Sequence, residues 1–320
     1  MPYYYDLLIA IMIITTALPA VIFLYNLFNK KNTWEKRHKK LTISFSTILF
    51  LGTTILIWGS FIESKLLLVN KQNIDLTQIN QEIKIAFVSD IHAGPYKKTK
   101  WVEKIVQKIL EQKPDIILIG GDDLYNSDYN EQELNYLSPL QNLTKQIPTY
   151  AIAGNHEYGI GDGKATKSRT ADWSKEHAQK LQKLGINYLE NNLKLLNIKN
   201  QNIYLFGGDS ILAQKLDYQI LNTREKNIPT IALIHNPAFL FKTTYPKFDL
   251  TLSGHTHGGQ IRLPFLGPIG RVDSIIPADF YQGLHKQING TYNFISSGAG
   301  ESGPRARLFN PPEIVLITIK

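Results

Sequence analysis

The segment LTLSGHTHGGQIRLP, residues 250–264, places His255 and His257 one residue apart, directly after an apolar run. The chain holds only eight histidines. Two imidazoles crowded together without carboxylate partners repel one another when protonated, and they gain little from burial. This spacing therefore predicts that two nitrogen ligands are needed at one point, which is a common role of histidine at a metal ion.

Polar residues also follow four other apolar runs, so that the runs 83–89, 115–121, 149–154, 230–234 and 249–253 all end in the same way. The residues that follow them are Asp90, His92, Asp122, Asp123, Asn155, His156, Glu157, His235, His255 and His257. Aspartate and asparagine are common turn formers, so any one of these residues alone is explained by a loop. In open α/β sheets, however, the loops at the carboxyl ends of strands converge and build sites. Five successive runs that end in this way predict a single site.

The residue types at these ends indicate which chemistry the site performs. Cysteine is absent from the chain, which excludes thiolate ligands, disulfides and cysteine nucleophiles. Two aspartates, one asparagine and four histidines supply mixed nitrogen and oxygen ligation, which suits Mn, Fe or Zn rather than calcium. Seven ligands are too many for one tetrahedral ion but suit two divalent metal ions about 3.5–4 Å apart that share a carboxylate. Such a pair orients a phosphate, and a further histidine then protonates the leaving oxygen.

The motifs D-x-H, G-D, G-N-H-[DE], an apolar strand ending in His, and G-H-x-H occur in that order over residues 83–265. This ordered set resembles the calcineurin-like metallophosphoesterase family. The resemblance implies a first metal site made of Asp90, His92, Asp122 and His257. It implies that Asp122 bridges to a second site, completed by Asn155, His235 and His255. By the same resemblance, His156 lies near the scissile phosphate as proton donor or charge stabiliser.

Asp123 stands where the family usually has an apolar or small residue. It is either a carboxylate that supports the site from outside or a rival for the bridging role of Asp122. Asp122 is preferred as the bridge because it directly follows the glycine pair at the end of its strand.

A longer resemblance concerns SGHTHGGQIRLP together with the tail SSGAGESGPRARLFNPPEI, which are similar to a membrane-anchored bacterial subgroup of the family. That subgroup includes UDP-2,3-diacylglucosamine pyrophosphatases of lipid A biosynthesis, which implies a lipid-linked phosphate substrate. Arg262, Arg305 and Arg307 either clamp a phosphate or form structural salt bridges. Lys97 is expected at a solvated helix start, and His38, His177 and His285 are expected at the surface.

Residues 7–28 and 41–62 carry no charge, and about 22 residues are enough to cross a hydrocarbon core of roughly 30 Å. The first segment lacks a basic stretch before it and is too long for a signal peptide, so we predict a two-helix transmembrane hairpin. Tyr3, Tyr4, Tyr5 and Trp58 are expected as interfacial anchors. Between the spans lies NKKNTWEKRHKK, which the excess of lysine and arginine places in the cytoplasm of a bacterial cell, with the protein multi-pass in the inner membrane. The same bias puts the catalytic domain on the other side, whereas UDP-linked lipid A precursors are made inside.

Two rival functions remain open on the sequence. A nucleotide or nucleic-acid phosphodiesterase would use the same metals, and the net charge of +8 favours it. Much of that charge lies in the basic turn, however, and no alternation of aromatic and basic residues indicates a nucleic-acid track, so no nucleic-acid partner is expected. The other rival is a non-catalytic membrane scaffold with a vestigial metal site, against which the full ligand set argues. The sequence predicts no particular oligomeric state.

The rest of the chain has the pattern of an α/β domain. Short apolar runs predict buried strands at residues 83–89, 115–121, 149–154, 202–208, 230–235, 249–254, 291–298 and 313–319. Amphipathic patterns predict helices at 99–113 and at 172–185, the second ending on Gly185. The fold that the family implies is two mixed β-sheets packed face to face and flanked by helices. We therefore expect a membrane hairpin over residues 1–70 and the metallophosphoesterase domain over residues 71–320.

Overall fold

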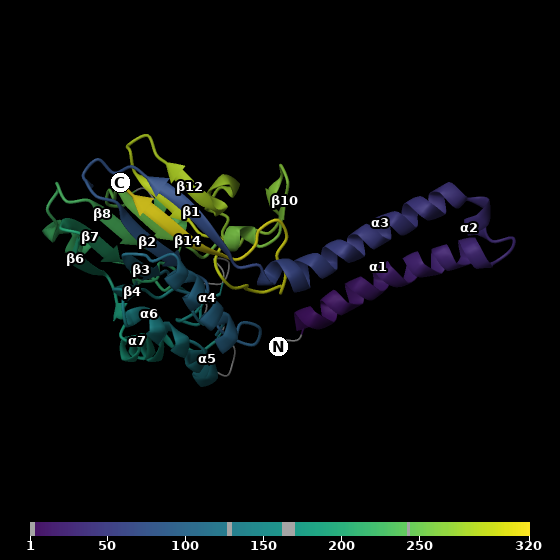
Figure 1. Cartoon of the computed structure of the whole chain (residues 1–320), viewed down its shortest axis with the longest axis horizontal. Coiled ribbons are helices and arrows are strands. Elements are labelled where there is room, and N and C mark those ends of the chain that lie inside the picture. Colours follow the sequence, from purple (N-terminus) through teal and green to yellow (C-terminus); the bar gives the residue numbers. More distant parts are fainter. Residues whose placement is uncertain (1–3, 127–129, 162–169, 242–243) are drawn as a thin grey trace.

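The computed structural model describes residues 4–126, 130–161, 170–241 and 244–320. Two long helices leave one end of a layered α/β domain, and the short α2 lies at the far end of the pair (Figure 1). The α-helices of the described residues are α1 Tyr4–Asn29, α2 Trp34–Arg37, α3 Lys39–Ile57, α4 Thr99–Glu111, α5 Asn130–Tyr136, α6 Gln141–Thr144 and α7 Ser174–Lys183.

The first sheet has six strands in the order β1-β14-β2-β3-β4-β5. Its strands are β1 Leu68–Ile74, β14 Glu313–Ile319, β2 Ile83–Val88, β3 Ile116–Ile119, β4 Thr149–Ala151 and β5 Asn187–Tyr188. β2, β3, β4 and β5 pair in parallel, whereas β14 runs antiparallel to β2 and parallel to β1. The carboxyl ends of β2, β3 and β4 therefore lie at one edge.

The second sheet also has six strands, in the order β12-β13-β9-β8-β7-β6. Its strands are β12 Gly283–Lys286, β13 Tyr292–Ile295, β9 Leu250–Ser253, β8 Thr230–Leu233, β7 Gln201–Gly207 and β6 Asn192–Ile198. β7, β8, β9 and β13 are parallel, and the outer strands β6 and β12 are antiparallel to their neighbours. A separate ribbon pairs β10 Arg262–Leu263 with β11 Gly267–Pro268.

Alternate side chains of the strands enter two different cores, because successive residues of a strand point to opposite faces. On β2, Ile85 and Phe87 pack between the two sheets, against residues of β8 and β9 such as Leu233 and Leu252. The other face of β2, with Ala86 and Val88, packs under the helices that cover the first sheet. The predicted fold of two mixed sheets with outer helices is thus confirmed.

The predicted helices are present: α4 begins at the expected Thr99 and ends at Glu111, and α7 lies within the expected range 172–185. α4 buries its apolar face, and α7 ends before Gly185, whose φ of +83° and hydrogen bond to the Gln182 carbonyl (3.0 Å) close the last turn. Six strands lie outside the predicted runs, namely β1, β5, β6, β10, β11 and β12. β1 begins at Leu68, so its first residues precede residue 71, where the domain was expected to begin.

α1 and α3 are both long and apolar enough to cross a membrane, and most of their surface is exposed. The helices run side by side (Figure 1), and the Thr53 hydroxyl donates to the Thr16 hydroxyl oxygen across their contact (2.8 Å). Of the expected anchors, Tyr4 and Trp58 are exposed, Tyr5 is half-buried, and Tyr3 lies outside the described residues. Length, composition and exposure together support membrane association of this hairpin.

The residues after the second span do not form a loose tether. A turn of π-helix, Trp58–Ile62, and a turn of 3₁₀-helix, Glu63–Lys65, continue α3 into the domain. Glu63 is buried there, and its carboxylate accepts bonds from the Asn310 amide (2.6 Å) and the Trp58 indole (2.8 Å). The Lys97 ammonium donates to the Ser64 carbonyl (2.6 Å). The hairpin is therefore joined to the domain by a buried polar contact.

Replacing Glu63 tests how firmly this junction is held. Glu63→Ala leaves the buried Asn310 amide without its acceptor and also removes the acceptor of the partly exposed Trp58 indole, so we expect a loss of about 1–3 kcal/mol in the free energy of unfolding. Thermal unfolding in detergent measures the change. Glu82→Ala, at a side chain that is 53% exposed, is the matched control and should change stability by less than about 0.5 kcal/mol. Equal stability of the two variants would contradict a structural role for Glu63.

Candidate metal centre

The loops after β2, β3, β4, β8 and β9 converge at the shared edge of the two sheets. Backbone hydrogen bonds lock neighbouring loops together: the Asp90 amide donates to the Gly121 carbonyl (2.9 Å), and the His92 amide donates to the Asp122 carbonyl (3.1 Å). Five of the seven expected ligands have a positive φ, between 46° and 67°. They are Asp90, His92, Asp122, His255 and His257. This conformation is uncommon for residues other than glycine, and its concentration here is typical of a functional site.

One group of candidate ligands contains Asp90, His92 and His257, whose ligand atoms all lie within 4.8 Å of one another. Nε2 of His92 lies 3.0 Å from Nε2 of His257, and the latter lies 3.5 Å from Oδ1 of Asp90. The two imidazole rings stack, with centroids 4.9 Å apart. Two ring nitrogens and a carboxylate oxygen thus face a common point, which is the arrangement that a bound cation requires.

A second group contains Asp122, His235 and His255, again with ligand atoms within 4.8 Å. Nε2 of His235 lies 3.1 Å from Oδ2 of Asp122, and Nδ1 of His255 lies 2.9 Å from the amide oxygen of Asn155. Asp122 also lies near the first group, because its Oδ2 is 4.0 Å from Nε2 of His92. Its carboxylate therefore stands between the two sets of imidazoles.

His156 differs from the other candidates because it is only partly buried. Its Nδ1 lies 2.9 Å from the carbonyl oxygen of Tyr125, and its backbone amide donates to Oδ1 of Asp122 (2.8 Å). His156, His92 and Asp122 also form a group within 4.8 Å. The structure thus brings all eight predicted residues together, with His156 at the open side.

Burial leaves three of the imidazoles neutral. It lowers the pKa of His255 to about 3 and the pKa values of His92 and His257 well below the usual value. Nε2 of His255 and Nδ1 of His257 are buried and have no hydrogen-bond partner in the described part of the chain. Neutral imidazoles with available lone pairs are the form that binds metals. The donor set therefore fits divalent cations.

His235 differs from these three imidazoles, because a nearby negative charge opposes the effect of burial on its pKa. Burial alone would lower the pKa of this imidazole, but the nearby Asp122 carboxylate raises the pKa to about 10. For Asp90, burial raises the pKa of the carboxyl to about 6. A cation at this point would compete with protons for both groups, since a ligand must be deprotonated to bind.

Glu157 holds the loops in place, a role that the sequence reasoning missed. Its buried carboxylate accepts hydrogen bonds from the backbone amides of Asp122 (3.0 Å), Leu124 (3.1 Å) and Gly154 (2.7 Å). Gly154 has to be glycine here, because a Cβ at this position would lie 2.1 Å from Oδ1 of Asp122. The acidic position of G-N-H-[DE] is the signal that could have identified Glu157.

Asp123 points away from the metal ligands. Its Oδ2 lies 2.9 Å from Nε2 of His177, and both side chains are fully buried. The expectation that His177 is a surface residue was therefore wrong, because α7 turns it inward against this carboxylate. His38 is exposed as expected, whereas His285 is half-buried and stacks on Phe280. This pairing removes Asp123 as a rival to Asp122.

The other basic candidates have structural contacts. Lys97 is buried rather than solvated, and its ammonium lies 3.1 Å from the Glu301 carboxylate. Arg307 is fully buried and donates to backbone carbonyls, including that of Ser297 (2.8 Å). Arg305 pairs with Asp6 of α1 (2.9 Å), and Arg262 donates to the Gly258 carbonyl (2.9 Å).

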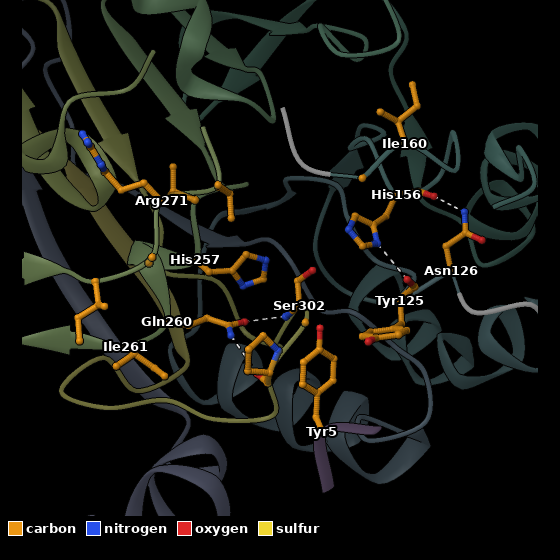
Figure 2. A pocket seen from close by; sticks show the side chains of 18 of the residues that line it. Tyr5, Tyr125, Asn126, His156, Ile160, His257, Gln260, Ile261, Arg271 and Ser302 are labelled. Carbon is orange, nitrogen blue, oxygen red and sulfur yellow. Dashed lines mark hydrogen bonds between the residues drawn. The ribbon is translucent and has the colours of Figure 1, made fainter. Parts of the chain in front are cut away.

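A cavity of about 670 Å³ opens beside the candidate ligands and includes His156 and His257 in its wall. Figure 2 shows the ring of Tyr5, from α1 of the hairpin, pointing into the space that these two histidines flank. The wall of the cavity is apolar in large part and includes Ile160, Ile261, Ile269 and Val272. Arg271 also lines the cavity, and the described lining residues include no aspartate or glutamate.

The sequence pattern of the calcineurin-like phosphoesterase family matches residues 83–259, and the chain belongs to this family. An uncharacterized metallophosphoesterase of Aquifex aeolicus is 32% identical over 82% of this chain and 95% of its own length. Phosphodiesterase YaeI of Escherichia coli is 31% identical over 58% of this chain and 64% of its own. A transmembrane protein with metallophosphoesterase domain from Bos taurus is 28% identical over 74% and 53%. The chain is therefore a metal-dependent phosphoester hydrolase, and the last relative adds weak support for membrane association.

Two substitutions distinguish the role of Asp122 from the role of His156. Asp122→Ala removes the carboxylate between the two ligand groups, so we expect the variant to lose bound metal and hydrolysis together. His156→Ala should keep its metal but hydrolyse substrate about 10²–10⁴-fold more slowly, which is the usual contribution of a general acid. Metal analysis and turnover of both purified variants measure these effects.

Two outcomes would contradict the assignments. If Asp122→Ala retained two metal ions and normal turnover, Asp122 would not be the shared ligand. If His156→Ala lost metal while its fold was intact by circular dichroism, His156 would itself be a ligand.

Proposed function

We propose that the protein hydrolyses a phosphoester or pyrophosphate bond of a lipid-linked substrate at the membrane surface, with two divalent metal ions. The observation that carries this proposal is that Tyr5, from a helix suited to a membrane, forms part of the wall of the cavity beside the candidate metal ligands. A substrate confined to the bilayer would meet this cavity directly. UDP-2,3-diacylglucosamine is the best single candidate, on the resemblance of SGHTHGGQIRLP and the carboxyl-terminal tail to the lipid A subgroup.

In this proposal Asp90, His92 and His257 would hold one ion, Asn155, His235 and His255 would hold the other, and Asp122 would be shared between them. The ions, either Mn, Fe or Zn, would supply Lewis acidity toward the phosphoryl oxygens and toward the attacking water. The ligands are already positioned for metal binding, because Glu157 fixes three backbone amides of the ligand loops. Burial keeps three of the imidazoles neutral, which is the form that binds metal.

His156 is proposed to deliver a proton to the leaving oxygen. Its Nδ1 faces the carbonyl of Tyr125. This contact fixes the orientation of the ring and leaves Nε2 pointing away from that carbonyl. In Figure 2 the ring lies at the wall of the cavity, opposite His257. A partly exposed imidazole can exchange protons with solvent between turnovers, which the buried imidazoles cannot do as readily.

The lining of the cavity supports an amphiphilic anion as substrate. Arg271 is an exposed lining residue whose guanidinium is directed away from His156 and His257 (Figure 2), so it offers a cation to a phosphate at the outer rim of the cavity. The described lining residues present no carboxylate that would repel the phosphate. The isoleucines and Val272 offer apolar contact to the start of an acyl chain. A highly charged and fully solvated nucleic acid would gain nothing from this apolar part of the wall.

A second candidate is a lipid phosphodiester, which the name of the phosphodiesterase relative favours. The side of the membrane separates the two candidates. The basic turn with α2 and the catalytic domain lie at opposite ends of the hairpin (Figure 1), which supports a domain outside the cytoplasm if the turn is inside. A reporter fused after Lys320 decides this, since a UDP-linked lipid is made inside and requires a cytoplasmic domain.

A substrate panel tests the proposed function. The full chain loaded with Mn²⁺ is given UDP-2,3-diacylglucosamine or a lipid phosphodiester in vesicles, a small soluble chromogenic diester, and single-stranded DNA. We expect kcat/KM for one of the lipids to exceed that for the soluble diester by about 10²-fold or more, because both partners share one surface. Tyr5→Ala should lower hydrolysis of that lipid more than hydrolysis of the small diester.

Preference for DNA over both lipids would replace this proposal with a nuclease. Absence of turnover on all four substrates with two bound metals would instead indicate the non-catalytic scaffold.

A further inference from the structure

The loop between β10 and β11 exposes large apolar side chains beside the cavity. Phe265 is 108% exposed and Leu266 is 77% exposed, so neither packs against the domain. Phe265 has a φ of 67°, in the left-handed region that bulky residues rarely adopt. A turn that displays two such side chains to water gains nothing for the stability of the domain itself. It therefore calls for an apolar partner outside the domain.

Backbone hydrogen bonds fix the position of this loop relative to the hairpin. The Gly59 carbonyl at the end of the second span accepts from the Arg307 amide (2.9 Å). The next residue, Leu308, accepts through its carbonyl from the Arg262 amide (2.9 Å), and Arg262 is the first residue of β10. Two backbone hydrogen bonds, made by the adjacent residues Arg307 and Leu308, thus connect the end of the second span to the start of β10. Figure 1 shows the β10 ribbon on the side of the domain from which the long helices leave.

The surroundings of the loop have the composition of an interfacial surface. Ile269 is 63% exposed and Phe309 is 60% exposed, and Phe309 directly precedes Asn310, whose amide donates to Glu63 at the base of the hairpin. Arg271, also exposed, follows a few residues behind the tip. Apolar tips backed by arginine suit the boundary of a bilayer, where the rings enter the acyl region and the guanidinium meets phosphates.

We propose that Phe265 and Leu266 insert into the same bilayer that α1 and α3 cross. The inference rests on the proposed membrane association of the hairpin and adds a second, independent contact. Because Ile269 and Arg271 belong both to this surface and to the cavity wall, insertion holds the mouth of the cavity at the level of the lipid headgroups. The lipid then enters the cavity from the membrane without crossing bulk water.

The absence of native cysteine allows a direct test, because every introduced thiol is labelled at one known position. Phe265→Cys, Ile288→Cys and Ile48→Cys are each labelled with NBD and reconstituted in vesicles of anionic and zwitterionic phospholipid. Ile288 is the matched control, since it is 110% exposed in the turn after β12, which lies farther from the helices than β10 (Figure 1). Ile48 lies in the middle of α3 and is 63% exposed, so it reports the hairpin itself.

We expect NBD at residues 265 and 48 to show blue-shifted emission and strong quenching by spin-labelled lipids. NBD at residue 265 should be quenched more strongly by a spin label near the headgroups than by one deep in the acyl chains. NBD at residue 288 should behave as in water. Quenching at residue 48 alone would overturn the inserted loop and leave the proposed membrane association standing. No quenching at residue 48 would overturn both. A blue shift at residue 265 that follows protein concentration and not lipid would identify a second copy of the chain and also overturn the proposal.

The double variant Phe265→Ser, Leu266→Ser supplies a functional readout. Neither residue lines the cavity, so hydrolysis of the soluble diester should stay unchanged. Hydrolysis of the lipid substrate in vesicles should fall by about tenfold, because two large apolar side chains no longer enter the acyl region. The same lipid in detergent micelles should show a smaller loss. Unchanged hydrolysis in vesicles would contradict a role of the loop in substrate access.

Discussion

The carboxylate of Asp122, buried between two groups of imidazoles, is the constraint on which the rest of the site depends. A buried carboxylate is stable only when charges and hydrogen bonds surround it, and here His235, the His156 amide and the neighbouring loops supply them. Its own backbone amide is held by Glu157, which also fixes the amides of Leu124 and Gly154. The sheets serve this arrangement by delivering five loops to one edge.

The same constraint explains where strain is located. Five ligand residues adopt a positive φ, at a cost of about 1–3 kcal/mol each for such residues. The cost is tolerable because the strands behind them are almost entirely buried and supply the opposing stability. The loops also approach very closely: a Cβ at Gly254 would lie 2.2 Å from Oδ2 of Asp90. Polar groups held this way are arranged for binding cations. Among the described residues, four of the ligand imidazoles each have a buried ring nitrogen without a hydrogen-bond partner in the protein.

Much of the site could be predicted from the sequence because each ligand lies within a few residues of the end of a continuous apolar run, and parallel strands bring such ends together. The same reasoning failed for side chains whose partner is distant in sequence. His177 lies on an amphipathic helix, and nothing in the neighbouring sequence indicates that it contacts Asp123, which lies 54 positions earlier in the chain. Lys97 was placed in solvent for the same reason, although Glu301 and Ser64 surround it. The edge strands β1 and β6 were not predicted because neither is a continuous apolar run: β1 carries four consecutive polar residues, and β6 mixes polar and apolar residues over a half-exposed surface.

The junction between hairpin and domain is the feature that sequence alone conceals most completely. Uncharged spans predict helices in a membrane, but not that Glu63 is buried against Asn310 or that Asp6 pairs with Arg305. These contacts make the hairpin part of the cavity beside the candidate ligands, because Tyr5, which directly precedes Asp6, lines its wall. A loose tether would only raise the local concentration of a lipid. In the proposed membrane arrangement, a fixed junction also sets the height and tilt of the cavity above the bilayer. The proposal therefore makes the depth of a scissile bond below the headgroup surface a determinant of specificity.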